Sequence, residues 1–136
     1  MGDPLLLLVD ENPDDVYLAL RELRRLGRRA DVYTISDSAQ ALSYLREAEE
    51  LPSALLLGLK FVHLSGLELL TELRSSERTR HLPVVILTAG PEELERVGRE
   101  VAHAKPVACI TKPLEITALR SALGDLGVGG TPVPAH

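Results

Sequence analysis

Short runs of apolar residues alternate along the chain with longer segments in which apolar residues recur every three or four positions. The first run, residues 4–9, is apolar at every position, and later runs cover residues 54–57, 83–88 and 107–111. Residues 30–36 are mixed, with Val32 and Thr34 on one face of a predicted strand and Tyr33 and Ile35 on the other. A strand that is apolar at successive positions is buried on both faces, as in the middle of a parallel sheet. The pattern therefore predicts five strands of one sheet.

The segments between these runs carry signals for helices. Asn12 can cap a helix that begins at Pro13, and Ser65 with Glu68 forms a capping box. Helices are predicted over residues 13–26, 38–49, from Ser65 onward, 90–102 and 115–126. Five strands that are each followed by a helix predict an α/β, doubly wound parallel sheet. We favour the flavodoxin-like (βα)5 strand order 2-1-3-4-5, and composition by itself leaves other doubly wound orders open.

Composition narrows the class of protein further. A length of 136 residues fits one domain, which we assign to residues 1–127, followed by a Gly/Pro-rich flexible tail at 128–136. The net charge of −5 argues against a nucleic-acid partner, and the single cysteine excludes an intrachain disulfide. The N-terminal apolar run is too short to cross a membrane and lacks the basic start of a signal peptide, so we expect a cytoplasmic protein without a membrane anchor.

Polar side chains fall where the predicted strands end. Asp10 and Glu11 follow the first strand, Thr88 ends the fourth, and Lys112 follows the fifth. In an open parallel sheet, ligands bind at the carboxyl ends of the strands. Two carboxylates there can hold Mg²⁺, while a hydroxyl and an ammonium can hold the oxygens of a phosphoryl group. Each residue alone also fits a simpler explanation, because buried strands exclude charges, but the set in this order favours a site.

Three motifs in this order resemble the receiver domains of response regulators in two-component signalling. They are residues 7–15, 83–88 and 110–113, and the resemblance runs from about residue 5 to residue 126. The Asn-Pro-Asp-Asp stretch is most similar to stand-alone receivers that partner phytochrome-type histidine kinases. The resemblance implies that Asp10 and Glu11 bind Mg²⁺, that Thr88 is the switch hydroxyl, and that Lys112 pairs with the phosphorylated carboxylate. It also implies a cis peptide bond between Lys112 and Pro113.

Two positions depart from the family pattern. Gly58 stands where the resemblance places the phosphoacceptor aspartate, and no Asp or Glu lies between Glu50 and Glu68. Cys109 stands where receivers usually have Tyr or Phe, and we expect it to be a small buried residue rather than a reactive thiol. With one carboxylate missing, we predict that Lys112 turns toward Asp10 and Glu11 and pairs with them, that Mg²⁺ binds weakly or not at all, and that no cofactor is required.

These departures predict a degenerate receiver that is not an enzyme. It is expected to act by protein–protein interaction, without aspartyl phosphorylation, on a sensor histidine kinase or another two-component protein. The family's usual contact surface lies on the fourth helix, fifth strand and fifth helix, where a homodimer can also form. Candidate contact residues there are Leu94, Val97, Val101, Ile116 and Leu119.

Other interpretations stay open at this point. A working phosphorelay response regulator with an atypical acceptor would use Ser65 or His63, which follow Gly58 in the sequence. Gly58 can also be an engineered substitution in a working receiver. An unrelated doubly wound enzyme is a third class, although the chain has no Gly-x-Ser-x-Gly elbow, Walker A loop, Gly-x-Gly-x-x-Gly fingerprint or Cys-x-x-Cys pair.

Overall fold

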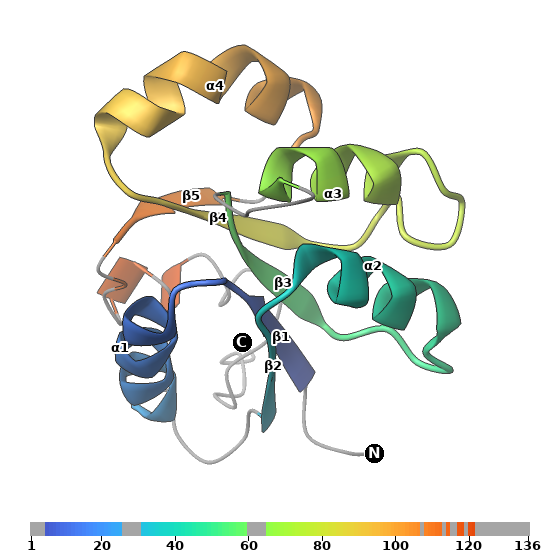
Figure 1. The fold of residues 1–136 in the computed structure, drawn as a ribbon, viewed down its shortest axis with the longest axis horizontal. Helices are drawn as coiled ribbons and strands as arrows, with labels where there is room; N and C mark the ends of the chain where they lie inside the picture. Colours follow the sequence, from blue (N-terminus) through green and yellow to red (C-terminus); the bar gives the residue numbers. More distant parts are fainter. Residues whose placement is uncertain are drawn as a thin grey trace, which may run out of the picture.

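Five parallel strands form one sheet with the order β2-β1-β3-β4-β5 (Figure 1). The computed structural model describes residues 5–25, 31–59, 65–106, 108–112, 114, 117–118 and 120–121. Along the chain the elements are β1 (Leu5–Val9), α1 (Pro13–Arg24), β2 (Asp31–Ile35), α2 (Ser38–Glu47), β3 (Ala54–Gly58), α3 (Gly66–Arg74), β4 (Val84–Thr88), α4 (Pro91–His103) and β5 (Ala108–Thr111). The predicted fold class and strand order are confirmed.

The helices begin where the capping residues predict. The Asn12 side chain accepts hydrogen bonds from the backbone N–H groups of Asp14 and Asp15, with Pro13 as the first helical residue. Ser65 and Glu68 make the reciprocal bonds of a capping box at the start of α3. The fifth predicted helix, at 115–126, lies largely outside the described residues, and the tail at 128–136 lies wholly outside them.

Successive strand residues pack into two separate cores, one on each face of the sheet. Leu7, Leu55 and Ile86 belong to the core beneath α2, α3 and α4, whereas Leu8 and Leu56 belong to the core beneath α1 (Figure 1). This two-sided burial explains why β1, β3 and β4 are apolar at almost every position. No helix within the described ranges has the length and the apolar character needed to cross a membrane.

Candidate functional site

Strand register brings the candidate residues to one edge of the sheet. Val9 is paired with Leu57, so Asp10 lies beside Gly58 at the carboxyl end of the sheet. Thr88 is paired with Thr111, so Lys112 follows at the same edge. A pocket of about 520 Å³ opens there, and among the described residues its lining contains five acidic side chains and one basic one. The lining residues are Asp10, Glu11, Asn12, Pro13, Asp14, Asp15, Leu59, Ala89, Glu93 and Lys112.

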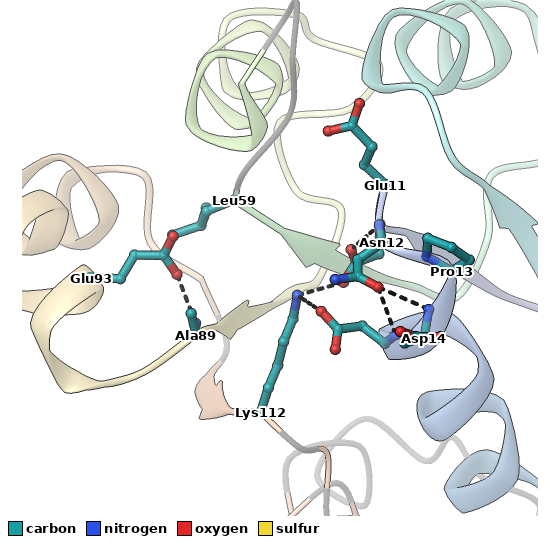
Figure 2. A pocket seen from close by; sticks show the side chains of 10 residues that line it. Glu11, Asn12, Pro13, Asp14, Leu59, Ala89, Glu93 and Lys112 are labelled. Carbon is teal, nitrogen blue, oxygen red and sulfur yellow. Dashed lines mark hydrogen bonds and ion pairs between the residues drawn. The ribbon is translucent and has the colours of Figure 1, made fainter.

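The ammonium of Lys112 is the centre of charge in this pocket. Its Nζ lies 2.8 Å from Oδ2 of Asp10 and 2.8 Å from Oδ2 of Asp15 (Figure 2). The other oxygen of Asp10 accepts a hydrogen bond of 3.0 Å from the backbone N–H of Asn12. Both oxygens of the buried Asp10 carboxylate are therefore engaged, which is the condition under which a buried charge is tolerated.

The prediction of an ion pair with Lys112 is confirmed for Asp10 and is wrong for Glu11. Glu11 is exposed, and its side chain is directed away from Lys112 (Figure 2). The second partner is Asp15, which is the third residue of α1. Helical geometry turns Asp15 toward the sheet, whereas Glu11 precedes the helix on the loop. The signal in the sequence is the pair of acidic residues at the start of this helix, Asp14 and Asp15, which the helix dipole also favours.

The surroundings of Lys112 act on its pKa in opposite directions. Burial disfavours the charged ammonium, but hydrogen bonds to Asp10 and Asp15 and the attraction of their carboxylates outweigh this effect. The pKa of Lys112 is therefore raised above its ordinary value. The ammonium stays protonated and holds the end of β5 to β1 and α1.

Gly58 ends β3 directly against the carboxylate of Asp10. A Cβ atom at residue 58 would lie 2.9 Å from Oδ2 and 3.1 Å from Cγ of Asp10. Contacts this short require Asp10 to move, and Asp10 is held at both oxygens. The Asp10 side chain thus lies where a side chain at residue 58 would begin. A residue larger than glycine fits at position 58 only if the ion pair between Asp10 and Lys112 rearranges.

Thr88 is almost fully buried at the end of β4. Its hydroxyl oxygen has no hydrogen-bond partner within the described part of the chain. Its carbonyl oxygen accepts a bond of 2.7 Å from the backbone N–H of Lys112, which fixes β5 against β4. A buried hydroxyl without a partner is costly in a folded protein, and the described neighbours of Thr88 do not satisfy its hydroxyl.

Glu93 is a pocket residue that the sequence reasoning missed. It is 7% exposed, and its carboxylate accepts a hydrogen bond of 2.8 Å from the backbone N–H of Ala89 (Figure 2). This bond ties the first turn of α4 to the end of β4. An acidic residue three positions after Gly90, the residue that precedes α4, is the signal that could have found it, because a glutamate there can reach back to a backbone N–H group.

Cys109 differs from its prediction. We expected a small buried residue, but Cys109 is exposed because β5 is an edge strand in which, within the described residues, only Ile110 is buried. Partial burial of the thiol nevertheless raises its pKa, which disfavours the thiolate that would act as a nucleophile.

The arrangement does not fit a bound magnesium ion. Mg²⁺ needs carboxylate oxygens that are free to coordinate it. Both oxygens of Asp10 are engaged, Asp15 is paired with Lys112, and Glu11 points away from them. Within the described ranges, no group of three His, Cys, Asp or Glu side chains is arranged to hold a metal ion.

The remaining candidates lie elsewhere or outside the described residues. The Ser65 hydroxyl accepts a hydrogen bond from the N–H of Glu68 as part of the α3 cap, and Ser65 does not line the pocket. His63, the other candidate atypical acceptor, and Pro113, the site of the predicted cis bond, lie outside the described residues. Of the predicted contact surface, Val101 is buried and Leu94 packs against the core. For the other three, Val97, Ile116 and Leu119, no side chain is described.

Comparison with known proteins gives a consistent result. The family model for the response regulator receiver domain matches residues 6–124. The chain is 32% identical to the probable methanogenesis regulatory protein FilR2 of Methanothrix harundinacea, over 98% of this chain and 91% of that protein. Matches also occur inside larger proteins: the sensor histidine kinase TmoS of Ectopseudomonas mendocina is 28% identical over 90% of this chain but only 12% of its own length.

Solved structures agree with this result. The bacteriophytochrome response regulator AtBRR superposes with a TM-score of 0.83 and 32% identity, covering 94% of this chain and 95% of that one. The bacteriophytochrome response regulator RtBRR superposes with a TM-score of 0.81 and 36% identity, covering 97% of this chain and 85% of that one. The sheet order, the residues at its carboxyl edge and these matches agree, and the chain belongs to the family of response regulator receiver domains.

Proposed function

We propose that this receiver domain acts in two-component signalling as an interaction module that does not depend on aspartyl phosphorylation. The observation that carries the proposal is Gly58 at the end of β3, with the Asp10 carboxylate lying against it. An aspartyl phosphate forms when a carboxylate oxygen attacks a phosphoryl donor. Glycine has no such oxygen, and Asp10 is engaged with Lys112 and Asn12.

The proposal extends from the acceptor to the rest of the pocket. Lys112 forms ion pairs with both Asp10 and Asp15. Its positive charge is therefore already balanced without a phosphoryl group. A positive charge at this position offsets the repulsion between carboxylates, which is the role that a divalent cation otherwise fills. Mg²⁺ is accordingly proposed to bind weakly. The domain is proposed to act through its surface and not as an enzyme.

The proposed partner is a sensor histidine kinase or another two-component protein. Two of the similar solved structures are described as bacteriophytochrome response regulators, and a matching segment lies within a sensor histidine kinase. A phytochrome-type histidine kinase is therefore the first partner to test. Its binding is expected to be the same with and without ATP, measured by isothermal titration calorimetry on the native chain.

The acceptor test compares the native chain with two variants, Gly58→Asp and Gly58→Ala. Each is incubated with acetyl phosphate and Mg²⁺, and intact-protein mass spectrometry then detects an added phosphoryl group. The native chain and Gly58→Ala are expected to gain none, whereas Gly58→Asp is expected to gain one. The alanine variant is the steric control, because it displaces Asp10 without supplying a carboxylate.

Phosphorylation of the native chain would disprove the proposal. Mapping the modified residue by tandem mass spectrometry would then separate Ser65 and His63 from other sites. If neither the native chain nor Gly58→Asp is labelled, the pocket has lost more than its acceptor, and the proposed loss of phosphorylation stands. The calorimetric measurement gives an independent check. If the affinity for the kinase changes when ATP is added, binding depends on phosphorylation and the proposal is contradicted.

A further inference from the structure

A basic groove lies at the edge of the sheet opposite the pocket. Two adjoining hollows, of about 510 and 670 Å³, share Arg74, Ala104 and His103 in their linings. They are formed by the C-terminal ends of α3 and α4 and by the segments that lead into β4 and β5. Among the described residues, the linings contain no acidic side chain and six basic ones, namely Arg74, Arg80, His81, Arg99, His103 and Lys105.

The guanidinium of Arg74 holds this groove in shape. It donates to the carbonyl oxygens of Ala104 at 2.7 Å, Leu82 at 2.8 Å and Arg80 at 3.0 Å. These bonds tie α3 to the loop before β4 and to the turn after α4. They also neutralise carbonyl dipoles that would otherwise repel an anion. The base of the groove is therefore built before any ligand arrives, and the other cations stay available.

Three further cations of the groove make no ion pair with any described residue. Within the described residues, Arg80, Arg99 and Lys105 are exposed and make no ion pair, whereas Arg46 on α2 pairs with Glu72 at 3.0 Å. Attraction to the C-terminal ends of helices accounts for His103, which is in the last turn of α4, but Arg99 lies before that turn. Nor does this attraction account for Arg80, which lies outside the helices.

The backbone of Lys105 adds a second observation. Its φ angle is +56°, a left-handed conformation that glycine adopts easily and that costs other residues about 1–2 kcal/mol. Glycine or asparagine is the usual residue where a helix ends in this way. A lysine in this position brings an exposed positive charge into the groove at the expense of backbone stability.

We propose that this groove binds an acidic segment of a partner polypeptide, whose carboxylates pair with Arg80, Arg99 and Lys105. The groove is concave, and so is the acidic pocket at the other edge, so two copies of the chain cannot fill each other's hollows. The chain carries a net charge of −5, which opposes a long polyanion that extends beyond the groove. Half-buried Pro83 supplies apolar lining suited to a peptide stem rather than to bare phosphate, with Leu82 and Ala104 almost fully buried at its base.

The test measures fluorescence anisotropy of a labelled oligoglutamate peptide titrated with the native full chain. The peptide is expected to bind saturably and to weaken as salt is added. The double reversal Arg80→Glu/Lys105→Glu is expected to weaken binding by about tenfold or more. The matched control is Arg21→Glu/Arg24→Glu on α1, which changes the net charge equally on the other face of the sheet and is expected to change affinity by less than about twofold.

Two-dimensional NMR of the native chain with the same peptide locates the contact. Shifts centred on residues 74, 80–82 and 103–105 support the proposal. It fails if the peptide does not bind saturably, if the α1 control weakens binding as much as the groove variant, or if the shifts gather at another surface. Tighter binding of inorganic phosphate or of a DNA oligonucleotide than of the peptide would also overturn it. Circular dichroism of both variants checks that they are folded.

Discussion

The ammonium of Lys112 acts in this pocket as a built-in counter-ion. Asp10 is 3% exposed, and a carboxylate with so little access to water needs a partner charge or hydrogen bonds. Lys112 supplies that charge to Asp10 and Asp15 at the same distance. Lys112 thus offsets the repulsion between the Asp10 and Asp15 carboxylates in the absence of a divalent cation. Removing its charge should therefore lower the stability of the fold.

Lys112→Met is expected to lower the free energy of unfolding by about 3 kcal/mol, because it leaves Asp10 charged and buried with, among the described residues, the Asn12 N–H group as its remaining partner. Urea denaturation at neutral pH measures the difference. Lys105→Met serves as the control, since Lys105 is exposed and has no ion pair among the described residues, and it should change stability little. Equal losses in the two variants would show that the ion pairs of Lys112 contribute nothing specific.

The same pair predicts a pH dependence. The pKa of Lys112 is higher in the folded chain than its ordinary value of 10.5, so the folded state holds this proton more tightly. Its contribution to stability is complete below that value and is lost as pH rises through the folded pKa. The difference between the native chain and Lys112→Met should therefore shrink in strongly alkaline solution and stay constant from neutral pH to about pH 9.

At the scale of elements, the start of α3 packs directly against the backbone at the end of β3. The contact is made by Gly66 of α3 and Gly58 of β3. The N–H of Gly66 donates to the carbonyl oxygen of Leu59 at 3.0 Å. A Cβ atom on Gly66 would overlap the carbonyl oxygen of Gly58 and lie 2.8 Å from Cα of Leu59. Both obstacles are backbone, which cannot rotate away as a side chain can. Gly66 therefore sets how closely α3 packs beside the pocket.

Gly66→Ala is expected to destabilise the fold by about 1–3 kcal/mol, because α3 must shift away from β3. Gly98→Ala, within α4, is the matched control. A Cβ atom there meets nothing within 4 Å, so the substitution should stabilise the helix by about 0.5–1 kcal/mol. Chemical denaturation of the two variants should give changes of opposite sign, and a neutral Gly66→Ala would contradict the packing described here.

On the scale of the whole molecule, acidic and basic side chains gather at opposite ends of the strands. The carboxyl edge carries the pocket with five acidic lining residues and Lys112, and the amino edge carries the basic groove. The pocket is occupied by its own ion pairs, whereas the groove has cations without partners among the described residues. The surface open to a partner is thus separated from the pocket by the length of the strands.

Magnesium should accordingly have little effect on the whole fold. A ligand that binds only the native state raises the unfolding temperature according to its concentration relative to its dissociation constant. The unfolding temperature of the native chain is expected to shift by less than about 1 °C in millimolar Mg²⁺. The unfolding temperature of Gly58→Asp should rise more on adding Mg²⁺, because the variant supplies a third carboxylate to the ion. A large shift for the native chain would show that Lys112 yields its position to the ion.

From the sequence the class of fold and the starts of the helices could be derived, whereas the strand order 2-1-3-4-5 was the favoured one among several until the sheet was seen. Apolar runs need two covering layers, capping residues act within four positions, and parallel strands bring their carboxyl ends to one edge. Those rules are local or follow from the sheet, and they are enough to place Asp10, Gly58, Thr88 and Lys112 at the carboxyl ends of the strands.

The packing of separate elements settles which of these groups come into contact. Asp15 and Lys112 are 97 positions apart, and Arg74 is 30 positions from the carbonyl of Ala104 that it bonds. The choice of Asp15 over Glu11, the bond between Glu93 and Ala89, the exposure of Cys109 and the basic groove all depend on how separate elements pack. Side-chain pairing is decided by distances of a few ångströms between elements, which no periodicity along the chain encodes.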